Sequence, residues 1–319
     1  MTTSVFPAHL PTDDELSTAL RRLLPASGAT VTARRPNAYT SSSRSEVVTV
    51  RTDDGDHLDF LVKYDRGSPD PLPSCRHGID YCARVYEAVV AAAPLQHLLT
   101  LGTIRIGAGS LPALVLEHLD GAFRVGEAPE VSGILSAAEW CGCFHRWAEP
   151  RRDAVELAFL ARYDADYYRA WADAALRRAA EAAALSPWLL EVCAAYSDLA
   201  GVLAAAPATI IHGEMSPQNV LWLDGEIYPI DWESAAIGPG EIDLAALLFG
   251  WPEETVGRCI DAYWEARQVP RPAGFPAHWA AATLYTALRW LPPPQGPHDP
   301  RFELALDRLR ETATALGVA

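Results

Sequence analysis

Short segments with alternating apolar and polar residues occupy the first third of the chain and predict β-strands. Residues 30–35 (TVTARR), 46–52 (EVVTVRT) and 57–64 (HLDFLVKY) are rich in β-branched residues and partly alternate. The sequence DDGD between the last two is a hairpin turn signal. Residues 103–107 and 111–119 predict two further strands.

Two helices are predicted in the same region. Thr12 followed by Glu15 forms a capping-box pattern, which predicts a helix over residues 13–24. Residues 78–92 carry apolar side chains at helical spacing. The N-terminal part is therefore expected to be a small antiparallel sheet with one inserted helix, ending near residue 117.

Helical periodicity dominates from about residue 130. Three segments show it before the next strands: 132–149, 164–184 and 186–205. A strand pair, 219–223 and 226–231, interrupts the helices and is joined by Asp224 and Gly225. Helices are expected again from Ile242 to the end. The whole pattern predicts an α+β fold.

Composition adds a limit on size and on binding partners. Half of the 319 residues are hydrophobic, so the chain can bury a substantial core, and its length suits two domains or two lobes sharing one cleft. The net charge of -15 argues against nucleic acid and against an anionic membrane surface as partners. It fits a cationic small substrate, or simply a soluble acidic surface.

The N-terminus and the cysteines bear on the compartment. Residues 1–15 lack a basic start and an apolar core, so no signal peptide is expected, and no apolar run approaches the length of a membrane span. The six cysteines include no CxxC pair and predict buried thiols in a reducing compartment. We expect a soluble, cytoplasmic protein.

Acids and an amide flank the predicted hairpin of residues 219–231. Glu214 and Asn219 precede it, and Asp231 and Glu233 follow it. Because the two ends of a hairpin lie side by side, Asn219 and Asp231 should be close in space. An amide oxygen and a carboxylate together suit Mg²⁺. Glu214 would then stand beside the metal, where a base can accept a proton from an attacking hydroxyl.

Lys63 lies in an apolar predicted strand. A lysine at such a place is more often a snorkelling edge residue. Together with the acids downstream, the functional interpretation is favoured, in which the lysine reaches nucleotide phosphates.

These motifs resemble a known family. HGEMSPQN (212–219) with IDWE (230–233) resembles the catalytic loop and metal-binding segment of the aminoglycoside phosphotransferase family, a branch of the protein-kinase-like fold that includes choline and other small-molecule kinases. The resemblance extends to the interlobe hinge at 114–121, a helix ending in His at 141–147 and a later helix start at 238–247, and it is weaker in the N-terminal lobe. The resemblance covers roughly residues 30 to 265.

The resemblance implies a two-lobe protein-kinase-like fold. Residues 1–117 would form an N-terminal nucleotide-binding lobe, with a small antiparallel sheet, one helix and an additional N-terminal helix. Residues 118–319 would form a mainly helical lobe with the catalytic loop, the metal segment and the acceptor pocket. The implied activity is ATP- and Mg²⁺-dependent transfer of the γ-phosphoryl group to a hydroxyl of a small molecule.

The resemblance also implies residue roles. Glu214 takes the position of the catalytic base, Asn219 and Asp231 those of the magnesium ligands, and Glu233 that of an additional metal-associated acid. Lys63 would hold the α- and β-phosphates. The resemblance also implies a loop over the phosphates at Ser41 to Ser45, which includes Ser42, Ser43 and Arg44, and backbone groups for adenine from Glu117 to Leu119. It implies structural roles for His212, which would brace the catalytic loop, and Asp243, which would tie a helix start to it. His145 lies on an apolar helix face and is expected to be a core histidine.

Three positions depart from the family pattern. The base position usually holds Asp, and Glu214 reaches about 1.5 Å farther, which favours an acceptor hydroxyl that sits correspondingly farther away. The loop over the phosphates has no glycine, so close backbone approach is harder. Cys82 falls where an acid should pair with Lys63; Asp80 and Glu87 are the substitutes, and Glu87 is preferred.

The acceptor stays open at this point. Acids between residues 153 and 173 suit a pocket for an aminoglycoside or another cationic natural product, or form an ordinary solvated helix face: Asp153, Glu156, Asp164, Asp166 and Asp173. A neutral sugar, a nucleoside or an amino alcohol is also open. The alternative from another class is a catalytically silent nucleotide-binding protein of the same fold.

Overall fold

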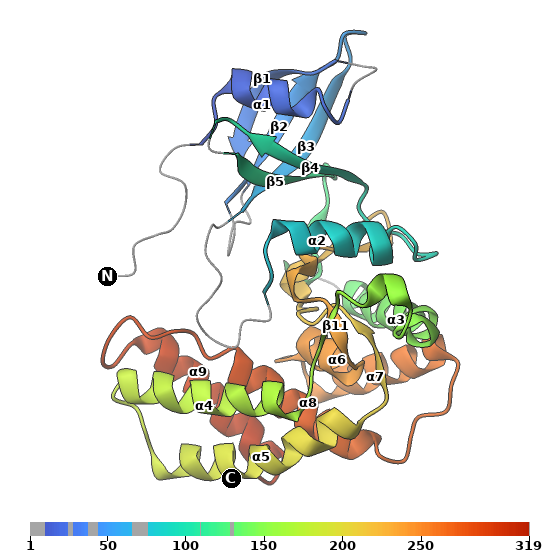
Figure 1. The fold of residues 1–319 in the computed structure, drawn as a ribbon. Coiled ribbons are helices and arrows are strands. Elements are labelled where there is room, and N and C mark those ends of the chain that lie inside the picture. The colour runs from blue at the N-terminus through green and yellow to red at the C-terminus, as the bar shows by residue number, and fades with distance from the viewer. Residues whose placement is uncertain are drawn as a thin grey trace. The chain divides into compact units, whose positions relative to one another are not determined.

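The computed structural model describes residues 10–24, 28–37, 44–65, 76–108, 110–127 and 131–318. The chain divides into two compact units. Unit 1 comprises Met1–Ala122 and Tyr228–Glu233, and unit 2 comprises Phe123–Ile227 and Ser234–Ala319. Figure 1 labels the helices and strands of both.

A five-stranded antiparallel sheet forms unit 1, in the strand order β1-β2-β3-β5-β4. The strands are β1 (Thr30–Pro36), β2 (Ser45–Arg51), β3 (His57–Tyr64), β4 (Thr100–Ile106) and β5 (Leu111–Glu117). All five predicted strands are confirmed. The predicted hairpin is confirmed as well, with Arg51 paired to His57 across the turn.

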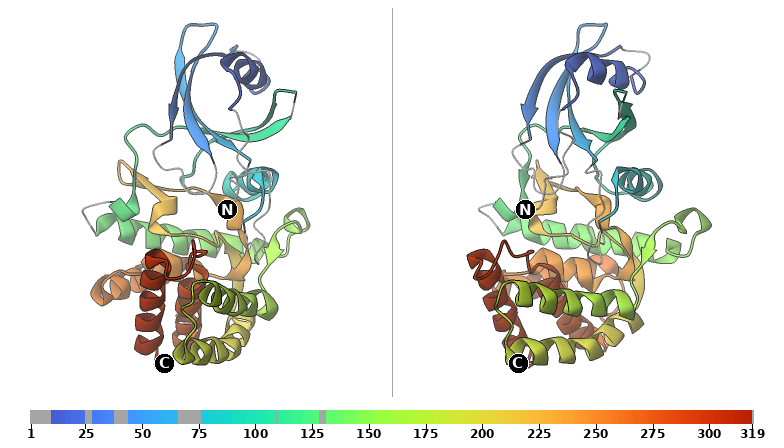
Figure 2. Two further views of the ribbon diagram at one scale, coloured as in Figure 1. Left: turned by 90° about the vertical axis from the view of Figure 1, so that its left-hand side faces the viewer. Right: turned by 60° about the vertical axis from the view of Figure 1, so that its left-hand side comes forward.

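Helix α1 (Asp13–Leu20) covers part of this sheet (Figure 2). The capping box is present: Thr12 Oγ1 accepts from the Glu15 N–H, and the Glu15 carboxylate accepts from the Thr12 N–H. Leu16 and Leu20 are fully buried in a core that also contains Val48 and Val62. The helix ends four residues before its predicted end, and residues Arg21–Leu23 form turns.

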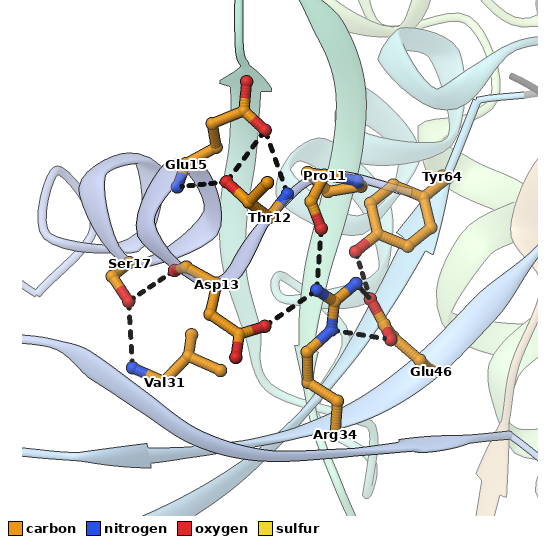
Figure 3. A network of polar contacts seen from close by, with 9 residues as sticks. All are labelled: Pro11, Thr12, Asp13, Glu15, Ser17, Val31, Arg34, Glu46 and Tyr64. Atoms are coloured by element: carbon orange, nitrogen blue, oxygen red, sulfur yellow. Dashed lines mark hydrogen bonds and ion pairs between the residues drawn. The ribbon is translucent and has the colours of Figure 1, made fainter. Parts of the chain in front are cut away.

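A buried polar network ties α1 to the sheet (Figure 3). The Arg34 guanidinium donates to both oxygens of Glu46, at 3.0 and 2.6 Å, and to the Pro11 carbonyl at 2.7 Å. The Tyr64 hydroxyl also donates to Glu46. Glu46 is only 5% exposed, and its hydrogen bonds with the Arg34 guanidinium raise the pKa of Arg34 above the usual range. Such a network fixes register, because a buried charge without its partners is costly.

The helix predicted over 78–92 is confirmed, with a change of pitch inside it. Helix α2 (Ile79–Val85) continues into a π-helical turn, η1 (Tyr86–Val90). The turn shifts the side chains that follow it around the helix axis, and π turns of this kind often occur at functional sites.

Helices make up most of unit 2. They are α3 (Ser132–Ala148), α4 (Ala165–Glu181), α5 (Pro187–Ala205), α6 (Glu241–Leu248), α7 (Glu253–Arg267), α8 (Phe275–Arg289) and α9 (Pro300–Ala315). Helix α3 packs on α7, α4 lies beside α5, and α8 contacts α4, α5, α6 and α9 (Figure 2). All predicted helices of this region are confirmed.

The strands of two small three-stranded sheets precede and follow the segment of residues 230–233 in the chain. One has the order β10-β9-β6, with β6 (Phe123–Arg124), β9 (Val220–Leu223) and β10 (Glu226–Pro229). The other has the order β7-β11-β8, with β7 (Ala161–Arg162), β8 (Ala208–Ile211) and β11 (Ala236–Pro239). The sequence did not predict β8 and β11, which are four residues each and pair antiparallel through Ala236 and Ile211.

Helix α5 is long and apolar enough to cross a membrane by length and composition. The expectation that no apolar run approaches that length is therefore wrong. In this structure α5 packs beside α4 and α8 and buries Leu189, Val192 and Leu203. A helix in the core of a globular protein can have the same length and apolar composition.

Candidate active site

The loop of residues 212–219 joins β8 to β9 and carries Glu214 and Asn219. Gly213 begins it with a φ of 77°. A Cβ atom at this position would lie 2.0 Å from the Ser234 carbonyl oxygen. Only glycine adopts this conformation at so close an approach. The loop therefore turns sharply against the chain that follows the metal segment.

Asp243, at the start of α6, holds this turn in place through its carboxylate. Its carboxylate accepts from the backbone N–H groups of His212, at 2.7 Å, and Gly213, at 2.8 Å. Nε2 of His145 lies 3.1 Å from Oδ2 of Asp243, and Nδ1 of His145 lies 2.9 Å from the Tyr263 hydroxyl. His145 is completely buried. The structural roles predicted for Asp243 and His145 are confirmed. His212 braces the loop as predicted, because its Nδ1 accepts from the Glu214 N–H at 3.3 Å.

Cys141, His145 and Asp243 offer ligand atoms within 4.8 Å of one another. Both ring nitrogens of His145 and both oxygens of Asp243 already have hydrogen-bond partners. Burial raises the pKa of the Cys141 thiol well above its ordinary value, which disfavours the thiolate that a metal needs. The triad is a structural hydrogen-bond network. Burial is confirmed for the free cysteines Cys82, Cys141, Cys193 and Cys259, whereas Cys143 is free but half-buried. Cys75 lies outside the described residues.

The Glu214 carboxylate is held by two side chains that sequence analysis did not single out. Its Oε2 accepts from Ser234 Oγ at 3.2 Å and pairs with Arg289 Nη2 at 3.3 Å. Arg289 is buried at the end of α8 and also donates to the Gly213 carbonyl. Its guanidinium lies 5.8 Å from the centre of the Trp171 ring. Arg289 thus braces both the loop backbone and the carboxylate.

Asn219 ends the loop in a short 3₁₀ turn, Pro217–Asn219. Its side-chain nitrogen donates to the Glu214 carbonyl at 2.9 Å. This bond fixes the amide plane, and the side-chain oxygen is the atom that suits a hard cation. Glu214 and Asn219 are therefore brought together on one loop of unit 2.

A second cluster belongs to unit 1 and centres on Lys63. Its ammonium pairs with Asp231 and, at 2.5 Å, with Glu233 Oε1. Burial lowers the pKa of Lys63, but the charges of both carboxylates outweigh it, and the net effect raises the pKa. Lys63 is 8% exposed, so it is a buried, paired cation and not a snorkelling edge residue.

The other predicted residues of unit 1 have different outcomes. Glu87 is exposed in the π turn, and the carboxylates on Lys63 are those of Asp231 and Glu233; the predicted pairing of Glu87 with Lys63 is therefore wrong. The alternative, Asp80, pairs with Arg105 at 2.8 Å. Ser42 and Ser43 lie outside the described residues. Arg44 is exposed, and its carbonyl accepts from the Tyr64 N–H.

Glu117 and Leu119 lie at the end of β5 and just after it. The Glu117 N–H donates to the Leu99 carbonyl at 2.9 Å, and the His118 N–H donates to the Asp59 carbonyl at 3.3 Å. Both Glu117 and Leu119 are half-buried. Because Asn219 and Asp231 belong to different units, their predicted meeting at one metal stays a prediction.

Ser234 and Arg289 could not be found from the motif alone. Ser234 follows IDWE directly, and a serine there has no distinctive pattern. Arg289 ends a helix far along the chain, and a lone arginine at a helix end is commonly a solvent-exposed residue that favours the helix dipole. The signal that distinguishes it is its burial, which only the tertiary structure shows.

The fold is that of the protein-kinase-like class, and the family match supports a small-molecule kinase that acts on hydroxyl groups. The sequence profile of the phosphotransferase enzyme family matches residues 38–291, and the chain belongs to this family. A comparison with curated proteins finds no match.

Solved structures with this fold include several small-molecule kinases. The GDP complex of wild-type aminoglycoside 2'-phosphotransferase-IIIa is similar with a TM-score of 0.65 at 12% identity, covering 95% of this chain and 99% of that one. A microcompartment-associated aminopropanol kinase gives 0.66 at 13% identity, covering 93% and 95%. Choline kinase LicA from Streptococcus pneumoniae gives 0.60 at 13%, covering 91% and 94%. At these identities the likeness shows the fold alone.

Proposed function

We propose that this protein transfers the γ-phosphoryl group of ATP to a hydroxyl of a small molecule, with Mg²⁺ as cofactor. The observation that carries the proposal is the pairing of the buried Lys63 ammonium with the carboxylates of the metal segment, Asp231 and Glu233. Nucleotide phosphates would engage such a lysine, and the metal that accompanies them would engage such an acid.

Lys63 would bind the α- and β-phosphates from the centre of the sheet. The adenine contact is assigned to the backbone after β5. Since the N–H groups of Glu117 and His118 are used within the protein, the Leu119 N–H is the donor that we assign to the base. The exposed Arg44 side chain, just before β2, is a candidate for phosphate contact.

Asp231 and Asn219 would hold the magnesium. Carboxylate and amide oxygens are hard donors of the type that Mg²⁺ takes from proteins, with phosphates and waters completing its shell. The Asp231 side chain is 25% exposed, so it is partly open to solvent. When bound, the metal neutralises charge that builds on the phosphates.

Glu214 would orient the acceptor hydroxyl and accept its proton. Ser234 and Arg289 fix the position of its carboxylate, and such positioning supplies a large part of the rate in phosphoryl transfer. The protein would do no covalent chemistry itself; its residues bind, orient and accept the proton.

The structure changes the weight of the acceptor hypotheses. Asp153 pairs with Arg162 at 2.7 Å, and Asp166 pairs with Arg169 at 2.9 Å. Asp164 caps α4 by accepting from the Tyr167 N–H. These acids, and Glu156 and Asp173, are exposed. They fit a solvated surface better than a pocket for a polycation. An aminoglycoside or other cationic natural product is therefore no better supported as the acceptor than a neutral sugar, a nucleoside or an amino alcohol.

Thermal unfolding with nucleotide tests the proposal against the silent-binder alternative. ATP should raise the melting temperature more with Mg²⁺ than without it, because ligands that bind only the native state stabilise it. Slow ATP turnover should be present in the wild type and lost in Asp231→Asn. Asp224→Asn, the same change at an exposed hairpin acid, should keep both properties. Stabilisation without any turnover would favour the silent binder, and no stabilisation by ATP or GTP would overturn both.

A further inference from the structure

The lysine that contacts phosphates in this class of fold requires a permanent acidic partner to hold it in place. Lys63 lies on β3, the central strand of its sheet, and is 8% exposed. A buried ammonium is stable only when a carboxylate or similar group pairs with it. The partner must therefore remain when Asp231 turns to a metal.

Helix α2 does not supply this partner. The α2 residue that lies near Lys63 is Cys82, which is 1% exposed. Burial raises the pKa of the Cys82 thiol well above neutral pH, so the thiol is uncharged. Of the acids in this helical stretch, Asp80 pairs with Arg105 on the surface, and Glu87 is exposed.

Glu233 meets the requirement. Its Oε1 lies 2.5 Å from Lys63 Nζ, and its side chain is 5% exposed, against 25% for Asp231. The backbone around it is anchored as well. The Glu233 carbonyl accepts from the His77 N–H at 2.9 Å. Trp232 is completely buried, and its indole N–H donates to the Pro229 carbonyl at 3.2 Å.

We infer that Glu233 is the permanent counter-ion of Lys63 and takes over the role of the missing helix acid, while Asp231 alone of this segment serves the metal. The inference rests on the proposed function for its meaning in catalysis, but the pairing itself is a property of the folded chain. It assigns Glu233 to the lysine and not to the metal, where the motif resemblance alone would put it. It also explains why a neutral cysteine is tolerated at position 82.

The inference is tested by measuring nucleotide binding in variants that remove the carboxylate at position 233 and place one at position 82. The affinity for ATP is measured by calorimetry, with Mg²⁺ and with EDTA, in wild type, Glu233→Gln, Cys82→Glu/Glu233→Gln and Cys82→Asp/Glu233→Gln. Glu233→Gln should weaken ATP binding by roughly tenfold or more, equally with and without metal, because the lysine loses its fixed position. An acid at position 82 should recover most of that loss.

A different outcome would assign Glu233 to the metal. In that case Glu233→Gln would weaken binding only with Mg²⁺ and raise the Mg²⁺ concentration needed, and no acid at position 82 would rescue it. This result would overturn the inference. Glu226→Gln, at an exposed hairpin position, is the matched control and should bind ATP like the wild type.

Thermal unfolding keeps the inference testable if the rescue variants do not fold, or if the wild type binds no nucleotide. Glu233→Gln should lower the melting temperature by roughly 5 to 15 °C, since it leaves a buried cation short of a partner. In the Lys63→Met background the same substitution should cost far less. Equal losses in both backgrounds would refute the pairing, whereas coupling without any nucleotide binding would refute only the proposed function.

Discussion

Shortening the side chain at position 214 tests whether the base is tuned by its length. Glu214→Asp keeps the charge and removes one methylene, which withdraws the carboxylate by about 1.5 Å. In the structure the Glu214 carboxylate contacts Ser234 at 3.2 Å and Arg289 at 3.3 Å. An aspartate on the same backbone reaches neither group.

The magnitude follows from these distances. The side chains of Glu214 and Arg289 are 12% and 6% exposed, so an effective dielectric constant of about 20 applies. Lengthening the charge separation from 3.3 Å to ~4.8 Å then weakens the attraction from about 5 to about 3.5 kcal/mol. The difference of about 1.5 kcal/mol corresponds to roughly tenfold in rate if it is expressed in the transition state. Misplacement of the base by more than ~1 Å adds up to about a hundredfold.

The assay is kcat for phosphoryl transfer at saturating ATP and acceptor. Glu214→Asp should lower kcat by roughly ten- to a thousandfold, with little change in the affinity for ATP. Glu226→Asp makes the same change at an exposed position and should be silent. A kcat within tenfold of the wild type would show that the reach of Glu214, and its contacts with Ser234 and Arg289, do not set the rate.

Three further predictions concern the support of the catalytic loop. Asp243→Asn removes a charged acceptor from two backbone N–H groups and should cost about 3 kcal/mol in urea unfolding; an unchanged midpoint would contradict the role of Asp243. Gly213→Ala should cost about 2 kcal/mol or more, since φ is 77° and Ser234 blocks the Cβ; a melting temperature equal to the wild type would count against the turn geometry. Burial lowers the pKa of His145 in the folded protein, whereas in the unfolded chain the histidine keeps an ordinary pKa of about 6.5. Below that pH the unfolded state binds more protons than the folded state, so the free energy of unfolding should fall as the pH drops. His145→Gln should lose this part of the pH dependence, and an identical pH profile would refute it.

Local patterns were enough to predict the elements of the N-terminal sheet. The alternation in 46–52 and 57–64 and the DDGD turn predict a hairpin, which the structure confirms. The Thr12–Glu15 capping box is equally local and is present. Such features depend on residues a few positions apart, so the sequence contains the information directly.

The partners of charged residues could not be predicted in the same way. Glu87 was the preferred acid of the helix, yet Lys63 pairs with Asp231 and Glu233, which lie far away in the sequence. The π turn at Tyr86–Val90 changes the helix phase just where Glu87 falls. Arg289 likewise reaches Glu214 only through the packing of α8. These contacts depend on long-range packing, which spacing along the chain does not encode.

The measurement that tests the central claim most directly is transfer of label from γ-labelled ATP to a panel of hydroxylated small molecules, read by mass spectrometry. The panel should include aminoglycosides, amino alcohols, neutral sugars and nucleosides. We predict that the wild type, with Mg²⁺, forms a phosphate ester on the hydroxyl of at least one class, and that Glu214→Gln and Asp231→Asn do not. Label appearing only in free phosphate, or an ester formed equally well by both variants, would contradict the account.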